Sequence, residues 1–455
     1  MSGVQLNKIW TGKLGEVLPI KYGKSLPAKL RDASGIVPVY GSSGRVGVHS
    51  EAITQGPALI VGRKGSVGSV YFSNEPCWPI DTAYYTEAVE GQDIRYFKYL
   101  LDSLHLKRLD KSTAIPGLSR DDYNALTVAI APIEEQRKIV AEFEKQFSRL
   151  DEAVANLKRV KANLKRYKAA VLKAAVEGRL VPTEAELARK AGRSFETGAL
   201  LLSQLLENRK RDWSGRNKYL EPLVPALPLG SASPEGWAWA TVDQISDFVT
   251  KGTTPAAEKL FDGSGDVQFL KVYNLTFDGT LNSSYKSAFI SRETHEEALV
   301  RSKVKPGDVL INIVGPPLGQ VSIVPNALAE ANINQAIARI RPLLPLDPRF
   351  IAMVLMCEDI MRWAIRRAKT TVGQMNLTLE LCRALPVPLP PLAEQARILA
   401  ETERRLLIVR GIETQVEVNL IRAKRLRQTV LARVFAAASN SAIRQDTKRR
   451  SNVSA

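Results

Sequence analysis

Cysteine and histidine are scarce in this chain, and neither residue type is clustered. The 455 residues include three cysteines and three histidines, all far apart: Cys77, Cys357, Cys382, His49, His105 and His295. The cysteine spacing argues against a disulfide framework or a zinc site and favours reduced, buried thiols in a cytosolic protein. We therefore expect no metal centre.

Long apolar runs are also missing. Hydrophobic residues make up 45% of the chain, but no run reaches the roughly 18–20 residues that a membrane span requires. The first residues, Met1 to Gln5, lack the charged and then apolar pattern of a signal peptide. We therefore expect a cytoplasmic protein without a membrane partner.

Catalytic motifs are the third absence. Residues 312–318 come closest to the Asn/Asp-Pro-Pro-aromatic loop of a DNA methylase, but they lack the polar residue directly before the prolines and the aromatic residue after them. Residues 62–68 have the glycines of a phosphate loop without its Gly-Lys-Ser/Thr ending. We interpret the chain as non-catalytic. A self-contained DNA methyltransferase or nuclease with an unrecognised site is the alternative.

Acidic residues are few relative to basic ones. The chain has 47 Asp and Glu against 64 Lys and Arg, which gives a formal net charge of +17 and a pI of about 9.7. Such an excess favours a polyanionic partner, because binding releases counterions from phosphates. Nucleic acid is the partner that this composition indicates.

The chain does contain a long internal repeat. Residues 132–139 (PIEEQRKI) return 259 residues later as residues 391–398 (PLAEQARI), and the register then continues without a gap, so that Lys165 falls on Lys424. A repeat of this size predicts two large units, each ending in a long helix. A chain with such pseudo-two-fold symmetry suits a partner that is itself nearly two-fold, such as duplex DNA.

Each copy of the repeat predicts a long helix. Pro132 and Pro391 suit a first helical turn, and the glutamates after them suit the positive end of the helix dipole. In the first helix nine of eleven heptad core positions are apolar, and in the second, from 399 to 434, eight of eleven are. We therefore expect the helices to pack together as an antiparallel coiled coil. The core positions of the first helix are Val140, Phe143, Phe147, Leu150, Val154, Leu157, Lys161, Leu164, Lys168, Val171 and Ala175.

The repeat also divides the chain. The predicted segments are a first domain at 1–131, a long helix at 132–180, a connector at 181–235, a second domain at 236–389, a second long helix at 390–436 and a flexible basic tail at 437–455. Both domains have the pattern of a mixed α/β (α+β) fold. Strands are predicted at 36–40, 58–61, 69–72, 267–272, 309–314 and 320–324, and helices at 93–107, 198–211 and 347–367.

The two domains resemble each other less closely than the helices do. Trp10 and Gly23 match Trp239 and Gly252 at an offset of 229, which grows to 259 by the end of the domain, so the second domain has about 30 extra residues. At Gly65 of the first copy the aligned residue is a proline, Pro316. Diverged loops on a shared scaffold indicate two recognition surfaces with different targets.

Basic residues beside turns are the candidates for DNA contact. Arg63 and Lys64 lie in the glycine turn after a predicted strand, and basic groups precede a turn-forming loop in both copies. Cations at a helix end are also ordinary C-terminal residues, and that reading stays equally open. The full set of candidates is Lys21, Lys24, Arg63, Lys64, Lys107, Arg108, Lys111, Lys251, Lys271, Arg366, Arg367 and Lys369.

The distal half of each long helix has basic residues with no acid among them. In the first helix they run from Lys158 to Lys173 and in the second from Arg422 to Arg433, and they enter the predicted seam at Lys168 and Arg427. A solvated face is the ordinary explanation of such a run. Because it occurs in both copies, we expect DNA phosphates or acidic partner subunits alongside it.

With this plan, the chain resembles the specificity subunit of Type I restriction-modification enzymes. The duplicated helix start is the most specific part of the resemblance, which covers nearly the whole chain. The stretches that carry it are Ser112–Ser119 with Ile130–Gln136, Thr370–Leu377 with Leu389–Gln395, Leu172–Pro182 and Pro234–Trp239.

The resemblance implies two target recognition domains, each reading one half of a split double-stranded DNA sequence. It also implies that the paired helices fix the gap between the halves and dock two modification subunits. Those subunits would carry S-adenosylmethionine-dependent N6-adenine methylation, and restriction subunits would carry ATP- and Mg-dependent translocation and cutting. No cofactor is then expected on this chain.

Overall fold

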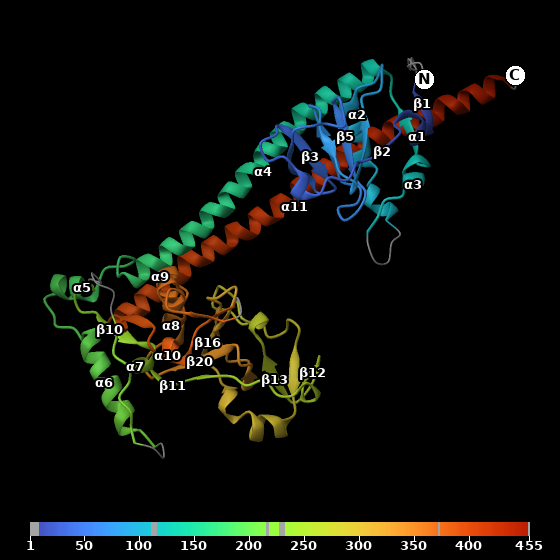
Figure 1. The fold of residues 1–455 in the computed structure, drawn as a ribbon. Helices are drawn as coiled ribbons and strands as arrows, with labels where there is room; N and C mark the ends of the chain where they lie inside the picture. The colour runs from blue at the N-terminus through green and yellow to red at the C-terminus, as the bar shows by residue number, and fades with distance from the viewer. Residues whose placement is uncertain (1–8, 111–115, 215–217, 227–232, 372–373, 454–455) are drawn as a thin grey trace. The chain divides into compact units, whose positions relative to one another are not determined.

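The computed structural model describes residues 9–110, 116–214, 218–226, 233–371 and 374–453. The chain forms two compact units: unit 1 comprises Met1–Val160 with Gln415–Ala455, and unit 2 comprises Lys161–Thr414. The two long helices, α4 (Ile133–Val176) and α11 (Leu392–Val453), each contribute one segment to either unit (Figure 1). The mixed α/β class predicted for both domains is confirmed.

Unit 1 is built on two small sheets with the strand orders β2-β8-β5-β6 and β4-β3-β7. Strand β5 is buried along its whole length because β6 and β8 flank it. The strands predicted at 36–40, 58–61 and 69–72 are confirmed as β3, β5 and β6. The elements are β1 (Trp10–Lys13), α1 (Leu14–Val17), β2 (Lys21–Tyr22), β3 (Val37–Gly41), β4 (Gly44–His49), β5 (Ala58–Gly62), β6 (Val70–Ser73), β7 (Trp78–Pro79), β8 (Ala83–Glu87), α2 (Ile94–Ser103), α3 (Arg120–Asn124) and β9 (Thr127–Ile130).

The helix predicted at 93–107 is shorter than expected. Asp93 caps α2 by accepting a hydrogen bond from the Arg95 backbone N–H. The helix ends at Ser103 because His105 has a left-handed backbone (φ 50°), and a 3₁₀ turn, Leu106–Leu109, follows it. Lys107 and Arg108 therefore lie on this separate turn.

Unit 2 also contains a four-stranded sheet, ordered β11-β20-β16-β18, and its second sheet has five strands, ordered β12-β14-β13-β19-β15, where that of unit 1 has three. The strands predicted at 267–272, 309–314 and 320–324 correspond to β13, to β16 with β17, and to β18. The elements are β10 (Ala238–Thr241), α7 (Val242–Ile245), β11 (Ser246–Lys251), β12 (Phe261–Asp262), β13 (Val267–Leu270), β14 (Ala288–Ile290), β15 (Lys303–Val304), β16 (Val309–Asn312), β17 (Val314–Gly315), β18 (Val321–Ile323), β19 (Ala331–Ile333), β20 (Ile337–Pro342), α8 (Pro348–Leu355), α9 (Glu358–Ile365), β21 (Lys369–Thr371), β22 (Gln374–Asn376), α10 (Leu379–Arg383) and β23 (Pro386–Leu389).

The single helix predicted at 347–367 is wrong. The structure has two helices, α8 and α9, because Cys357 adopts an extended backbone (φ −67°, ψ 126°) between them. Cys357 is buried, as are Cys77 and Cys382, and all three thiols are free.

The first and last strands of each domain pair with each other. In unit 1 β1 runs antiparallel to β9, and in unit 2 β10 runs antiparallel to β23. The second shared feature is a close approach of two backbone segments at a pair of equivalent glycines, Gly23 and Gly252. A Cβ atom on Gly23 would lie 2.1 Å from the Ile80 carbonyl oxygen, and one on Gly252 would lie 1.9 Å from the Ile333 carbonyl oxygen. Only glycine allows the backbone to pass so closely at this position.

The repeated glutamine joins each domain to its helix. Gln136, in the first turn of α4, donates from Nε2 to the Ala131 carbonyl just after β9 (2.8 Å). Gln395, in the first turn of α11, donates to the Pro390 carbonyl just after β23 (2.8 Å). Both side chains are buried. The motif therefore ties the end of the last strand to the first turn of the helix in both copies.

The two long helices run antiparallel within each unit. In unit 1 Phe143 contacts Phe435 (ring centroids 5.9 Å apart), while Arg427 pairs with Asp151 further along α4 (2.6 Å). In unit 2 Lys168 pairs with Glu413 (2.8 Å). Val140 and Phe147 share a buried cluster with Leu431 and Phe435 of α11, and Ala175 shares one with Ile398 and Leu399. The predicted antiparallel packing is confirmed in both units.

The connector contains two helices. The helix predicted at 198–211 is confirmed as α6 (Gly198–Arg211). A second helix, α5 (Glu184–Ala191), was not predicted, although Thr183 and Glu186 form a capping box at its start. At the other end of the chain α11 continues to Val453, where a flexible tail was predicted from 437.

In the part of the chain that the structure describes, no helix is long and apolar enough to cross a membrane.

Candidate nucleic-acid interface

An open groove with a volume of about 630 Å³ lies on the first domain where the glycine turn meets the loop before α3. Backbone hydrogen bonds join these segments, from the Leu118 N–H to the Arg63 carbonyl (2.8 Å) and from the Gly65 N–H to the Pro116 carbonyl (3.3 Å). The residues that line the groove are Tyr22, Arg63, Lys64, Tyr84, Gly117, Leu118, Ser119, Arg120 and Asp121.

Arg63 is the best positioned cation in this groove. Its guanidinium lies over the Tyr22 ring (4.9 Å to the centroid) and also donates to the Asp81 carbonyl (3.0 Å). Arg120 approaches Tyr22 as well (5.8 Å), and the Tyr22 side chain is half exposed. Flat cations stacked on an exposed aromatic ring match the requirements of nucleic acids, which present phosphates and π faces.

The same backbone frame occurs in the second domain. There Ile313 takes the place of Arg63: its N–H donates to the Ala336 carbonyl (2.8 Å), and its carbonyl accepts from the Leu377 N–H (2.9 Å). In the first domain the Arg63 N–H donates to the Thr82 carbonyl (2.9 Å). These backbone hydrogen bonds identify which residues of the two domains correspond, without reference to their side chains.

The frame also corrects one sequence alignment. Gly65 bonds to Pro116 in the first domain, and Gly315 pairs with Met375 in the second. Gly65 therefore corresponds to Gly315, and its predicted match with Pro316 is wrong by one residue. The second turn is one residue longer, which sequence comparison could not locate.

Side chains on this shared frame differ at every position of the groove that carries a positive charge or an aromatic ring, while Asp121 corresponds to another acid, Glu380. The equivalent positions follow from the paired backbone bonds and strand registers. In order, Tyr22, Arg63, Lys64, Tyr84 and Arg120 become Lys251, Ile313, Val314, Ala338 and Leu379. The second domain therefore does not repeat the chemistry of the first groove.

A different aromatic and cationic surface occurs on the second domain. Tyr273 and Tyr285 pack edge to face (5.9 Å between centroids), and both rings are partly exposed. Lys286 lies within 5.8 Å of both rings, and Lys271 lies 6.0 Å from Tyr273. These residues come from the segment between β13 and β14, which holds part of the second domain's extra length.

The remaining candidates of the first domain lie outside the groove lining. Lys21 pairs with Glu87 (3.3 Å), and it points away from Tyr22 because neighbouring residues of a strand face opposite sides. Lys24 lies over the Trp78 ring (5.6 Å). Lys107 and Arg108 are exposed on the 3₁₀ turn after α2. Lys111 lies outside the described residues.

The remaining candidates of the second domain are dispersed. Lys251 is exposed at the end of β11, at the position that Tyr22 occupies in the first domain. Arg366 follows α9, and Arg367 stacks on Trp363 (4.4 Å). Lys369 begins β21, and its side chain lies outside the described part. That Lys107 with Arg108 and Arg366 with Arg367 are equivalent DNA contacts stays a prediction.

The basic runs of the long helices are partly neutralised within the chain. Both seam cations have acidic partners, as Lys168 pairs with Glu413 and Arg427 with Asp151. Arg427 also lies over the Phe147 ring (4.6 Å). These two residues are thus part of the helix packing, while Lys158 and Lys165 stay exposed to a partner.

The two segments that were compared with catalytic motifs are structural turns. The Asn312 side chain donates to the Pro317 carbonyl (2.6 Å) and accepts from the Gln320 N–H (2.8 Å), so its amide is occupied within its own loop. In the glycine turn the Gly68 N–H donates to the Gly62 carbonyl (2.8 Å), which uses an amide that a phosphate loop would offer to its ligand.

Sequence reasoning missed Tyr22 and Arg120 as groove residues. Tyr22 directly precedes the repeated Gly23, and Arg120 directly follows the loop that the repeat singles out. Their position beside repeated motifs was the available signal. It also missed a polar cluster around His295, Glu296 and Glu330 in unit 2.

Comparison with known proteins agrees with this geometry. Residues 7–166 match the family described as Type I restriction modification DNA specificity domain. Over 381 residues the chain is 25% identical to the Type I restriction enzyme EcoBI specificity subunit of Escherichia coli, which covers 83% of this chain and 72% of that one. It is 24% identical over 444 residues to the EcoDI specificity subunit of Escherichia coli, with 96% and 90% covered.

A solved structure supports the fold. A chain from a structural study of complex assembly and conformational transition in the type I R-M system aligns with a TM-score of 0.59 and 17% identity, covering 94% of this chain and 98% of that one. The comparisons agree with one another: residues 7–166 match the Type I restriction modification DNA specificity domain, and most of the chain is similar to Type I restriction enzyme specificity subunits.

Proposed function

We propose that this chain is the non-catalytic subunit that selects a bipartite DNA sequence for a cytoplasmic Type I restriction-modification complex. Each domain reads one half-site in double-stranded DNA. The long helices dock two modification subunits, which methylate adenine at N6, and restriction subunits join through that complex. The partner subunits bind S-adenosylmethionine, ATP and Mg, so the chemistry takes place outside this chain.

One observation carries the proposal: the two domains share a backbone frame and differ in the side chains that it presents. Arg63 in the groove of the first domain and Ile313 in the second domain make the same backbone hydrogen bonds. A guanidinium can donate to guanine or phosphate, whereas isoleucine offers only apolar contact. Two such surfaces on one chain suit a target with two unlike halves.

The helices support the docking of two similar partners. Tyr167 on α4 and Leu426 on α11 are equivalent in the 259-residue repeat, and both are large exposed side chains, at 44% and 54% exposure. Exposed apolar residues at equivalent positions suit two copies of one partner, each contacting one helix.

The central experiment combines the chain with its modification subunit, S-adenosylmethionine and genomic DNA, followed by sequencing of methylated adenines. We expect two short specific blocks separated by a fixed unread gap. Methylation or cutting by the purified chain alone would instead support the alternative of a self-contained enzyme. A chain that shows no salt-dependent DNA binding in any combination would be only a scaffold.

A second experiment tests the helices as the device that fixes the gap. A four-residue insertion near Leu157 in α4, with a matched insertion near Leu420 in α11, adds about one helical turn (roughly 6 Å) to the paired helices. We expect the gap to lengthen while both sequence blocks stay the same. An unchanged gap, or changed blocks, would contradict this role.

A further inference from the structure

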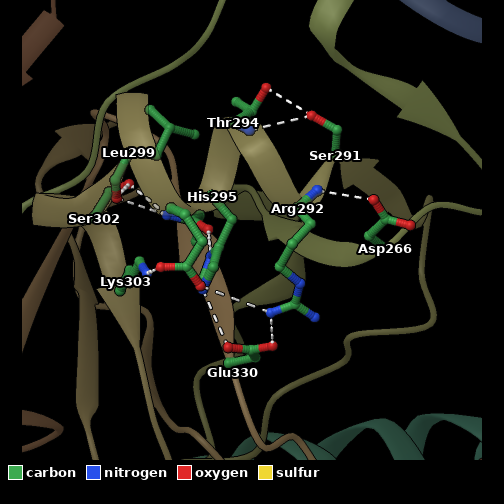
Figure 2. Close-up of polar contacts among 11 residues, drawn as sticks. Asp266, Ser291, Arg292, Thr294, His295, Leu299, Ser302, Lys303 and Glu330 are labelled. Carbon is green, nitrogen blue, oxygen red and sulfur yellow. Dashed lines mark hydrogen bonds and ion pairs between the residues drawn. The ribbon is translucent and has the colours of Figure 1, made fainter.

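A buried histidine in the second domain faces two carboxylates. His295 lies in the short π-helical segment Thr294–Ala298, and its side chain is 1% exposed. Glu296 is its neighbour in the chain, and Glu330 directly precedes β19. Ligand atoms of these three residues lie within 4.8 Å of one another. Figure 2 shows His295 beside Glu330, with Arg292 and Lys303 around them.

Asn332 fixes which nitrogen of His295 carries the proton. The Asn332 amide nitrogen donates to the Leu299 carbonyl and to the Ser302 hydroxyl, both at 2.9 Å. Because a carbonyl can only accept, the amide cannot be turned round, and Asn332 Oδ1 must face His295 Nδ1. Nδ1 is therefore the donor, and Nε2 of the neutral imidazole offers a lone pair.

The Nε2 atom then faces oxygen atoms that can only accept. Glu330 Oε2 lies 3.1 Å from it, and Glu296 Oε1 lies 3.6 Å from it. Three acceptors in contact need a positive charge between them. Zinc ligands about 2.0–2.2 Å from a tetrahedral ion are separated from each other by roughly 3.3–3.6 Å. The Glu296 distance falls within this range, and the Glu330 distance of 3.1 Å would have to lengthen by a few tenths of an ångström.

In each carboxylate one oxygen faces His295 and the other binds a basic side chain. The second oxygen of Glu330 binds Arg292, and the second oxygen of Glu296 binds Lys303. Lys303 and Arg292 therefore orient the two carboxylates, as outer groups do around metal ligands, and the nearer contact of Arg292 to the oxygens facing His295 is a long one, 4.0 Å from Glu296 Oε1.

We propose that His295 Nε2, Glu296 Oε1 and Glu330 Oε2 bind a divalent transition-metal ion, with water as the fourth ligand. The ion is Zn²⁺, because zinc prefers imidazole and carboxylate ligands. The ion joins the π-helical segment to the strand β19. Both belong to the part of unit 2 that carries Tyr273 and Tyr285, so the metal stabilises the support of that surface.

The site belongs to the second domain alone. Backbone bonds from Lys24 to Pro79 and from Thr253 to Ile333 align β7 with β19. On that alignment Trp78 and Pro76 stand in the first domain where Asn332 and Glu330 stand in the second. The first domain therefore supplies no carboxylate at this position.

The experiment uses the full-length chain, freed of metal with a chelator, and titrates it with Zn²⁺ and separately with Co²⁺. We expect one ion per chain, a rise in Tm on adding Zn²⁺, and the visible absorption of four-coordinate Co²⁺. Glu330→Gln changes a 40% exposed side chain and so preserves the fold. It should lower the Zn²⁺ affinity by on the order of 10–100-fold, and His295→Gln should lower it at least as much.

His105→Gln is the matched control, because it removes a histidine of unit 1 and should leave the Zn²⁺ affinity unchanged. Absence of stoichiometric Zn²⁺ binding by the wild-type chain overturns the proposal, since a proton on Nε2 then serves as the positive charge. Equal Zn²⁺ affinity of the wild-type chain and Glu330→Gln overturns it as well. Neither result depends on DNA binding, so the proposed function is tested separately.

Discussion

The groove of the first domain and the equivalent positions of the second domain share a backbone frame but present different side chains. In the first domain Arg63 stacks on Tyr22 beside Lys64, and in the second Ile313 and Val314 occupy the positions of the two cations. The hydrogen bonds that fix these positions come from backbone groups alone. A side chain here can change without disturbing the frame, which explains how two surfaces diverged on one duplicated scaffold.

At the joint between each domain and its long helix, equivalent side chains are retained in the two copies. Arg95 pairs with Asp93 and Glu144 (3.0 Å each), and Arg349 pairs in the same way with Asp347 and Glu403 (2.7 and 3.0 Å). These side chains join each domain to its own helix. The side chains at the domain–helix joint are thus retained, while those of the groove are replaced.

The largest predicted difference between the two halves is the loss in free energy of unfolding when one seam residue is replaced by alanine. Phe143 packs on Tyr99, Phe147 and Phe435, while its counterpart in α11, Thr402, contacts Met353 through its hydroxyl (3.6 Å). Phe143→Ala should lower the free energy of unfolding by about 3–5 kcal/mol and Thr402→Ala by about 1 kcal/mol. Urea unfolding of both variants tests this, and equal losses would show that the seam is equally packed in the two units.

Replacing the two repeated glutamines should give a smaller difference in the free energy of unfolding. Gln136 also accepts from the Asp93 N–H (3.0 Å) in addition to its bond to Ala131. Gln136→Ala should therefore cost about 2–3 kcal/mol and Gln395→Ala about 1–2 kcal/mol, because buried partners lose their bonds. Thermal unfolding checks the order, with Glu135→Ala as the exposed control. A smaller loss for Gln136→Ala contradicts the bond assignment.

Substitutions in the grooves should separate the two half-sites. In the complex with the modification subunit, Arg63→Ala should weaken DNA binding about tenfold, whereas Val314→Ala should change it less than about twofold. Arg63→Lys keeps the charge without the flat stacking group and should recover only part of the loss. Methylation sequencing then checks that Arg63→Ala relaxes one half-site; relaxation of both would show that the domains do not read separately.

The smallest effect concerns pH. Hydrogen bonds from Arg404 and Arg405 lower the pKa of Glu401 to about 2 from its ordinary value of 4.5. A lowered pKa means that the carboxylate stabilises the fold above pH 4.5 and that this contribution is lost as the pH falls toward 2. Glu401→Gln should flatten the dependence of Tm on pH across this window at low salt.

The equivalent residue Glu142 supplies the control. It accepts from the Gln146 amide (2.6 Å) and has no arginine at the equivalent positions. Glu142→Gln should leave the slope of Tm against pH unchanged. If both substitutions flatten the slope alike, the arginine pair is not its cause.

Local sequence signals predicted the scaffold well. The glycine and proline punctuation located the strands β3, β5 and β6, and the heptads located the seam. The predicted start of α6 at Gly198 is correct, and the structure shows Thr197 as its capping residue, with a side chain that accepts from the Leu200 N–H (3.2 Å). The Gly23 and Gly252 match marked a close backbone approach that no side chain permits. Each of these features depends on neighbours in the sequence or on the repeat.

Features that depend on distant contacts were not predictable. Nothing local marks the break at Cys357, because the flanking residues favour a continuous helix. Tyr22 and Arg120 are far apart in the chain and meet only through the loop that bonds to Arg63. Likewise His295 and Glu330 approach only because β19 runs beside β13 in a parallel pair.

The division of α11 between the units has a consequence for synthesis on the ribosome. Leu431 and Phe435 are buried in the same core as Tyr96 and Phe143 of the first domain. That core therefore lacks one wall until almost the whole chain has been translated. The domain made first is completed last, and until then its aromatic seam needs protection from aggregation.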